Sequence, residues 1–249
     1  MEPNVELITY TPEPDYVVYL AARTCYSQDI NYDIKYKKYN QEQIEKLLDQ
    51  VKKSGHHSVF EHVSFTFAIK NVSRAFLAQV TRHRIGISLS VQSQRFVSME
   101  NTDTDEFVYG KYYDNSDMTK NLGDGIYERL YHDALSTYSQ LLDLGYKKEE
   151  ARLVLPNGIP TKMVITMNAR ELMHYFNLRC CKRTQFEHRE VAYKMLKLVK
   201  RVAPIIFRDA GASCVQLGYC PEIKGCGSYP TLEQIKEVYN KHKGDNENE

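Results

Sequence analysis

The sequence lacks any apolar run long enough to cross a bilayer, and its beginning, Met1-Glu2-Pro3-Asn4-Val5-Glu6, has neither the basic start nor the apolar segment of a secretory signal. It also lacks an excess of either charge. Thirty-three Lys and Arg face 32 Asp and Glu, which gives a formal net charge of +1. So small a charge does not recruit nucleic acid or an anionic membrane, so local groups must bind any anionic ligand.

The cysteines do not predict a disulfide framework. Six cysteines in 249 residues, without a predicted signal, are typical of reduced thiols in the cytoplasm. Five residues separate Cys214 from Cys220, and five separate Cys220 from Cys226, which is wider than the usual spacing of zinc ligands. We therefore expect no metal site, and a zinc protein that uses these three cysteines is kept as an alternative.

The glycine pattern of the common dinucleotide-binding fold is absent as well. Gly123-x-Gly125 is followed by Glu128, and Gly225-x-Gly227 by Pro230, where a third glycine would stand. Any dinucleotide must therefore be bound in another way, for example by arginines that contact its diphosphate.

The periodicity of apolar residues predicts a mixture of helices and strands in one domain, residues 1–249, with residues 243–249 as a disordered tail. Residues 99–118 lack periodicity and predict a long loop. Pro204 requires a kink or a break in the last helix. The predicted helices are 15–26, 41–53, 75–80, 125–144, 147–155, a helix from 169, and 185–209, and the predicted strands are 62–70 and 163–167.

Cationic and hydroxyl groups are concentrated between Arg82 and Arg95. If the helix 75–80 continues, Arg82, His83 and Arg84 leave its axis about 100° apart, and they then contact more than one ligand or one extended ligand. Two alternatives stay open. The cations can be a solvated helix end, or they can belong to a nucleic-acid-binding module with Lys182 and Arg183.

The predicted helix after Asn168 has an apolar stripe and a polar stripe. The apolar stripe is Ala169, Leu172, Met173 and Phe176, and the polar stripe is Arg170, His174 and Asn177. Arg179 continues the apolar line. A guanidinium keeps its charge, so this side chain must reach solvent or meet an acceptor, such as an acidic imide or a phosphate.

Three histidines and a carboxylate lie between His56 and His62, but their spacing does not match a metal-binding motif. Ser58-x-x-Glu61 instead predicts a capping box at the start of a helical turn. Such a start offers free N–H groups to an anion.

Several motifs together resemble flavin-dependent thymidylate synthase. They occur in the family's order and span most of the chain. The motifs are Ala22-Arg23-Thr24-Cys25-Tyr26, His56-x-Ser58-x-x-Glu61-His62, Arg82 through Arg95, Ala151-Arg152-Leu153-Val154-Leu155-Pro156, and Asn168-Ala169-Arg170-Glu171-Leu172-Met173 through Asn177-Leu178-Arg179.

The resemblance implies reductive methylation of dUMP to dTMP, with 5,10-methylenetetrahydrofolate as carbon donor, FAD as cofactor and NADPH as reductant. It also implies an α+β fold with a central antiparallel sheet packed by helices, of the thymidylate synthase-complementing type. We expect a cytoplasmic homotetramer whose active sites are shared between subunits, without nucleic acid or membrane as partner.

The same resemblance implies the site residues. The expected FAD-binding residues are Ser58, Arg82, His83, Arg84, Asn168, Arg170 and His174. The expected dUMP-binding residues are Gln79, Arg82, Ser93, Gln94, Arg95, Arg152 and Arg179. Arg179 is the expected catalytic residue, because the family's arginine here favours ionisation of the uracil N3 and enriches electron density at C5. No cysteine is given a catalytic role.

The chain departs from the family pattern at three positions. Eight residues separate Arg84 from Ser93 where seven are usual, and we place the extra residue near Gly86, which leaves Ser90 as a competitor of Ser93. Some members have Glu where Val91 stands, so Ser90 or Gln92 is expected to substitute for it. Some members have Asn where His174 stands.

Overall fold

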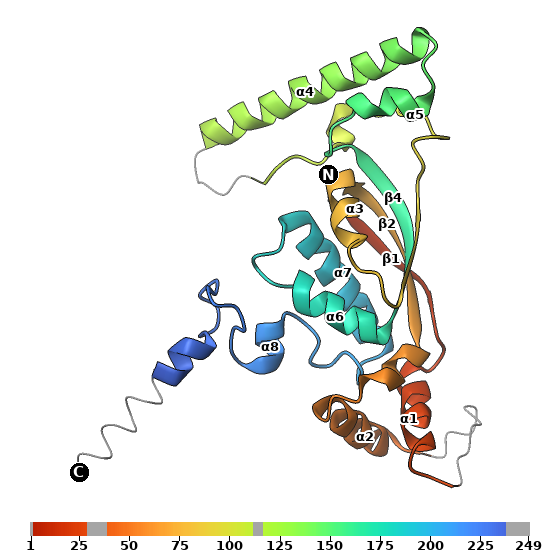
Figure 1. The fold of residues 1–249 in the computed structure, drawn as a ribbon, viewed down its shortest axis with the longest axis vertical. Coiled ribbons are helices and arrows are strands. Elements are labelled where there is room, and N and C mark those ends of the chain that lie inside the picture. The colour runs from red at the N-terminus through yellow and green to blue at the C-terminus, as the bar shows by residue number, and fades with distance from the viewer. Residues whose placement is uncertain (1, 29–38, 112–116, 238–249) are drawn as a thin grey trace. The chain divides into compact units, whose positions relative to one another are not determined.

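A computed structural model describes residues 2–28, 39–111 and 117–237 (Figure 1). The chain forms two compact units. The first comprises Met1–Thr9 and Thr66–Thr166, and the second comprises Tyr10–Phe65 and Met167–Glu249. The single domain expected from the sequence stays a prediction, and the predicted tail 243–249 lies outside the described residues.

The first unit is built around a four-stranded sheet with the order β1-β2-β4-β3. Its strands are β1 (Asn4–Tyr10), β2 (Ser64–Ser73), β3 (Ile87–Val91) and β4 (Pro160–Asn168). The Thr66 and Thr166 hydroxyls lie 2.9 Å apart, and the Arg74 N–H bonds the Ile159 carbonyl at 3.1 Å. Residue numbers rise along β2 as they fall along β4, so this pair is antiparallel. The predicted α+β class with an antiparallel sheet is confirmed.

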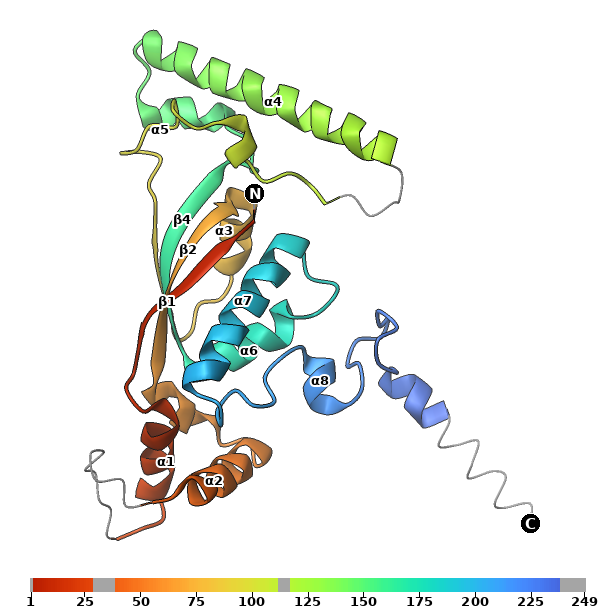
Figure 2. The same cartoon turned by 180° about the vertical axis from the view of Figure 1, so that it is seen from behind.

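Strand β2 confirms the predicted strand, because Phe65, Phe67 and Ile69 are buried and alternate with less buried neighbours. Strand β4 extends the predicted strand 163–167 at both ends. Strands β1 and β3 were not predicted. Figure 2 shows β1, β2 and β4 side by side, as Figure 1 does from the other side.

The helices of this unit include α3 (Arg74–Val80), α4 (Asp117–Asp143) and α5 (Lys148–Ala151). The Ser73 hydroxyl caps α3 by accepting the Phe76 N–H at 3.0 Å. Short 3₁₀ turns lie at η3 (Thr104–Glu106) and η4 (Arg152–Val154). The predicted helix 147–155 is therefore wrong in its second half, where the chain tightens into η4 before Pro156.

Helices dominate the second unit. They are α1 (Pro14–Thr24), α2 (Gln41–Lys53), α6 (Ala169–Arg179), α7 (Phe186–Val202) and α8 (Ser213–Leu217), with a 3₁₀ turn η2 (His57–His62). Three buried rings form part of its core. Phe207 contacts Phe65 and Phe176 edge to face, with centroids 5.4 and 6.0 Å apart.

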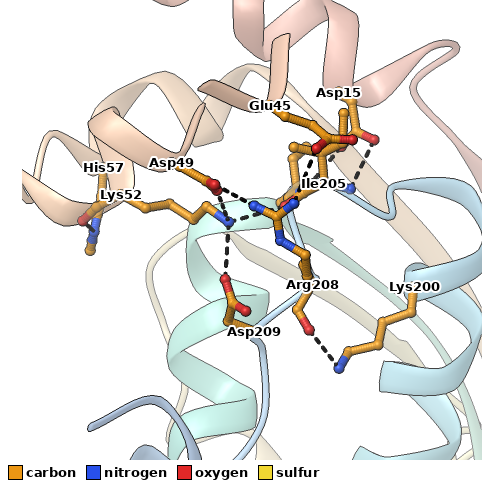
Figure 3. A network of polar contacts seen from close by, with 10 residues as sticks. Asp15, Glu45, Asp49, Lys52, His57, Lys200, Ile205, Arg208 and Asp209 are labelled. Atoms are coloured by element: carbon orange, nitrogen blue, oxygen red, sulfur yellow. Dashed lines mark hydrogen bonds and ion pairs between the residues drawn. The ribbon is translucent and has the colours of Figure 1, made fainter. Parts of the chain in front are cut away.

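Helix α7 ends at Val202, so the predicted helix 185–209 is too long. Pro204 has no N–H to continue it. The Asp15 carboxylate then accepts the N–H groups of Ile205 at 3.1 Å and Ile206 at 2.9 Å (Figure 3). Burial raises the pKa of Asp15, although these two hydrogen bonds act in the opposite direction.

An ionic cluster in the same figure ties α2 to the segment after α7 (Figure 3). Arg208 contacts Asp49, and it lies 3.4 Å from the carboxylate of Glu45. Lys52 donates to the Ile205 carbonyl at 3.1 Å and lies 3.5 Å from Asp209. These contacts hold the chain after Pro204 in a fixed, non-helical course within this unit.

Candidate functional site

The cationic residues after α3 lie in a turn and not in a helix. The helix ends at Val80, and the N–H groups of Arg82 and His83 bond the carbonyls of Gln79 and Val80 at 3.3 and 3.1 Å. The expectation of side chains about 100° apart on a helix is therefore wrong, because the backbone has already left helical geometry. The three side chains differ instead in how far they are buried.

His83 is 6% exposed, whereas Arg82 and Arg84 are exposed. Within the described residues, neither guanidinium is paired with a carboxylate. Gly86 follows with a φ of 71°, a left-handed conformation that suits glycine, and β3 begins at the next residue. The turn thus presents two uncompensated cations, which is the chemistry that an anionic ligand requires.

A second turn follows β3 at the predicted Ser93-Gln94-Arg95 site. The Ser93 hydroxyl accepts the Arg95 N–H at 3.2 Å, and the Ser93 carbonyl accepts the Val97 N–H at 3.0 Å. Gln94 is only 8% exposed, and its Nε2 has no hydrogen-bond partner among the described residues. Ser90 is exposed on β3, so both serine candidates lie in this part of the unit.

Glu149 brings two of the predicted nucleotide-binding arginines together. Its carboxylate lies 2.7 Å from Nε of Arg95, and its backbone carbonyl accepts Nε of Arg152 at 3.1 Å. An open hollow of about 550 Å³ lies beside this contact, with Phe96 and Tyr146 in its lining. The sequence did not predict a role for Glu149, because nothing in the run Lys147–Glu150 distinguishes Glu149 from Glu150.

Helix α6 and its N-cap carry the predicted residues of the second unit other than Ser58. The Asn168 side chain accepts the Glu171 N–H at 2.8 Å, which confirms the predicted cap. Ala169, Leu172 and Phe176 are buried, as the apolar stripe predicts. The stripe also includes Tyr175, which was not predicted, and burial raises the pKa of its phenol.

The polar face of α6 contacts η2. Arg170 forms a salt bridge with Glu61, and both side chains are about half exposed. The predicted capping box of Ser58 and Glu61 is wrong, because η2 begins after His56 and has no side-chain cap. Ser58 therefore lies inside the 3₁₀ turn, where it is exposed, and Glu61 orients Arg170 instead.

Arg179 is the last residue of α6, so the helix extends far enough for it to continue the apolar line, and its side chain is partly buried. Cys180 follows it and is buried. Burial raises the pKa of the Cys180 thiol to about 12, so this group is a neutral thiol at physiological pH. Within this unit Arg179 thus lies where an apolar surface meets solvent.

The predicted site residues divide between the two units. The first unit holds Gln79, which is half-buried on α3, together with Arg82, His83, Arg84, Ser93, Gln94, Arg95 and Arg152. The second unit holds Ser58, Asn168, Arg170, His174 and Arg179. Their binding and catalytic roles stay predictions.

The zinc alternative finds no support in the described part of the chain. All six cysteines are described and free, and no group of three or more His, Cys, Asp or Glu there is arranged to hold a metal ion. Arg183, one of the residues of the nucleic-acid-binding alternative, already forms an ion pair, since its guanidinium lies 3.1 Å from the Glu222 carboxylate. No described helix is long and apolar enough to span a membrane.

Comparison with known families decides how these residues are to be read. Residues 6–205 match the family model of the thymidylate synthase complementing protein, and this range includes every predicted site residue. This chain belongs to that family. The resemblance inferred from the sequence motifs is thereby confirmed.

Relatives within the family are similar along nearly their whole length. A flavin-dependent thymidylate synthase of Geobacter sulfurreducens is 43% identical over 219 residues, which are 88% of this chain and 91% of the relative. One of Clostridium tetani is 39% identical over 248 residues, covering 95% and 96%. One of Pyrococcus furiosus is 36% identical over 226 residues, covering 88% and 89%.

A solved structure shows the same fold. The UMP/dUMP methylase PolB from Streptomyces cacaoi, bound with 5-Br dUMP, superposes with a TM-score of 0.70 at 26% identity. The match covers 83% of this chain and 94% of the methylase chain. The thymidylate synthase complementing family and this methylase therefore share an architecture.

Proposed function

We propose that the protein methylates dUMP reductively to dTMP, with 5,10-methylenetetrahydrofolate as carbon donor, FAD as cofactor and NADPH as reductant. The observation that carries the proposal is the pair of turns between Arg82 and Arg95. They offer Arg82 and Arg84, which have no carboxylate partner among the described residues, and the buried Nε2 of Gln94, which has no hydrogen-bond partner there. The relatives within the family are named flavin-dependent thymidylate synthases.

The groups around Glu149 suit a nucleoside monophosphate. Glu149 engages Nε of Arg95 and Nε of Arg152, so the outer N–H groups of both guanidiniums can donate to phosphate oxygens. Gln94 adds an amide that can pair with a base or a sugar. Gln79 and Ser93 complete the proposed contacts, and the methylase bound with 5-Br dUMP supports this choice of substrate.

The donors proposed for FAD fit a group with a diphosphate and a ring that becomes anionic on reduction. Arg82 and Arg84 are exposed cations for the diphosphate, and His83 is buried beside them. Arg170, oriented by Glu61, is a further cation. Ser58, Asn168 and His174 are the remaining proposed contacts. When bound, the flavin supplies hydride transfer from the reductant.

Arg179 is the proposed catalytic residue. A guanidinium beside the uracil N3 favours its ionised form, because opposite charges stabilise each other more strongly in a partly desolvated site. The negative charge then enriches electron density at C5, the carbon that is methylated. A partly buried arginine at the end of an apolar stripe suits this role.

The proposal includes the assembly and location of the enzyme. We place it in the cytoplasm as a homotetramer of single-domain chains, whose active sites combine residues of different subunits.

Purified protein tests the proposal directly. It should be yellow, its flavin spectrum should bleach with NADPH, and it should form dTMP only when dUMP, the folate and NADPH are all present. A colourless protein that contains zinc, or one that binds oligonucleotides in a salt-sensitive way without forming dTMP, would contradict the proposal.

A further inference from the structure

Four of the six cysteines gather beyond the end of α6, although they are spread over 46 positions of the chain. Cys181 follows α6, Cys214 lies in α8, and Cys220 and Cys226 lie in the segment after α8. All four belong to the second unit. Burial raises the pKa of the Cys214 thiol, and the charges of the other three raise it further, so they lie close to it. We call these four residues the thiol cluster.

Helix α8 is held against α6 at this place. The Ser213 hydroxyl, next to Cys214, donates to the Asn177 carbonyl of α6 at 3.3 Å. Figures 1 and 2 show α8 beside α6 from both sides. Cys214 therefore lies in a helix whose start is fixed to the last turns of α6.

The segment after α8 is held to the turn that carries Cys181. The Arg183 guanidinium donates to the Glu222 carboxylate and to a backbone carbonyl of the same segment, both at 3.1 Å. A Cβ placed on Gly225 would lie 3.4 Å from the Cys220 sulfur, so the chain immediately before Cys226 packs against that sulfur. These contacts gather the thiols independently of their charges.

One thiol of the cluster is both accessible and acidic. Cys226 is exposed, and its sulfur lies 3.4 Å from the Ser228 hydroxyl oxygen. The hydrogen bond with Ser228 lowers the pKa of the Cys226 thiol, and the positive charge of Lys182 acts in the same direction. Thiolates are the reactive form of cysteine, and an accessible thiolate beside a second thiol is typical of oxidation-sensitive sites.

We propose that the thiol cluster is a modification site at which hydrogen peroxide joins Cys226 and Cys214 in a disulfide. The Cys226 thiolate attacks one peroxide oxygen, so an S–O bond forms, the O–O bond breaks, and the leaving hydroxide takes up a proton to give water. Cys214 then loses its proton and attacks the sulfenic sulfur. The S–S bond forms, the S–O bond breaks, and the second oxygen leaves as water. The two thiols lose two electrons to the peroxide. This inference does not depend on the proposed function.

Cys214 is the expected second thiol for two reasons. It is partly exposed, and Cys226 is among the groups whose charge acts on it. Cys220 is the main competitor, but its side chain belongs to a residue that is only 8% exposed. A zinc site made from the same thiols is the competing use of the cluster, although the described residues hold no group arranged to bind a metal.

Peptide mapping of the oxidised full-length protein tests the linkage. After reduction and removal of the reductant, treatment with hydrogen peroxide in the dark should consume two of the six thiols. Trypsin cleaves after Lys224, so peptides 209–224 and 225–236 should stay joined until a reductant is added. The first peptide contains both Cys214 and Cys220. The link should therefore persist in Cys220→Ser and disappear in Cys214→Ser.

The rate of thiol loss tests the role of Cys226. We expect Cys226→Ser to slow it at least about 10-fold, whereas Cys25→Ser, which removes another exposed cysteine of the same unit, should change it less than about 2-fold. Ser228→Ala keeps every thiol and removes the hydrogen bond, so it should slow the reaction about 2- to 5-fold at neutral pH. Circular dichroism confirms that each variant is folded.

Four results would overturn the inference. They are a link that persists in Cys214→Ser, loss of thiols without any disulfide, equal rates in Cys226→Ser and Cys25→Ser, and purified protein with one bound zinc per chain that blocks oxidation. A link that requires Cys226 and Cys214, and that forms more slowly in Ser228→Ala, supports it.

Discussion

The Nε atom of Arg95 lies 2.7 Å from a carboxylate oxygen of Glu149. This contact uses the inner N–H of the guanidinium, so its outer N–H groups do not take part in it. Since the Glu149 carbonyl also holds Arg152 at 3.1 Å, one residue orients two cations of the proposed nucleotide site. Glu149 is thus a positioning residue that only the structure shows.

Replacing Glu149 with Gln should therefore impair nucleotide binding more than chemistry. The variant keeps the backbone contact to Arg152 and loses the charged contact to Arg95, so we expect the KM for dUMP to rise about 2- to 5-fold, the range of a partly exposed ion pair. The kcat should stay near wild type. Steady-state kinetics at saturating folate and NADPH measures both, and Glu150→Gln, the exposed neighbour in α5, is the control. A fall in kcat without a change in KM would refute this role.

Arg170 should matter for the flavin and not for the nucleotide. Its exposed guanidinium is oriented by Glu61, so Arg170→Ala should weaken FAD binding about 10-fold, and Glu61→Gln should weaken it less. Quenching of flavin fluorescence on titration of the apoprotein gives both affinities. Arg183→Ala breaks a comparable exposed pair with Glu222 in the same unit and should leave FAD affinity unchanged. Equal weakening in all three variants would rule out a specific contact.

Asp49 predicts a pH dependence of stability. Burial raises its pKa, but hydrogen bonds from Arg208 and Lys52 outweigh burial and leave the pKa below the ordinary 3.8. A lowered carboxylate pKa stabilises the fold fully above the ordinary value, and the contribution is lost as pH falls through the lowered one.

The free energy of unfolding of Asp49→Asn should therefore depend less on pH than that of wild type below about pH 4. At neutral pH the loss should stay below about 1 kcal/mol, because the pair is partly exposed. Urea titrations across this range measure the difference, with Asp143→Asn, an exposed residue at the end of α4, as control. Parallel curves for wild type and Asp49→Asn would contradict this electrostatic assignment.

Arg179→Ala should abolish turnover and leave the flavin bound, because the proposed partner of Arg179 is the pyrimidine. We expect kcat to fall at least about 100-fold, the usual effect of removing one charge-stabilising donor. Arg179→Lys should recover part of the activity, since the charge remains and the fork is lost. Absorbance of the purified variants reports flavin content, and its loss in Arg179→Ala would show that Arg179 has been misassigned.

Local chemistry made much of this fold predictable. The stripe on α6 and its Asn168 cap depend on neighbouring residues, and the alternation in β2 depends on one buried face, so all three could be read from the sequence. Strand β3 was missed although Ile87–Val91 alternates apolar and polar residues, because the strand is only five residues long and its apolar side chains are only partly buried at the edge of the sheet. Its pairing depends on β4, about 70 residues later in the chain.

Distant contacts account for what the sequence did not show. Glu149 gains its proposed role from Arg95, 54 positions away, so no local pattern marks it. Glu61 was predicted to cap a turn, and its actual partner, Arg170, lies 109 positions away. The end of α7 is similar. Pro204 predicts a break, but the contacts that fix the chain after it, such as those of the Asp15 carboxylate with the N–H groups of Ile205 and Ile206, come from distant residues.

Release of the C5 hydrogen from labelled dUMP tests the central claim most directly, because methylation at C5 must replace that hydrogen. The assay compares reduced, flavin-loaded protein with and without the folate and NADPH. We predict that the release requires bound flavin and that it is lost in Arg179→Ala. No release from wild-type protein under reducing conditions, with flavin and folate present, would contradict the proposed function.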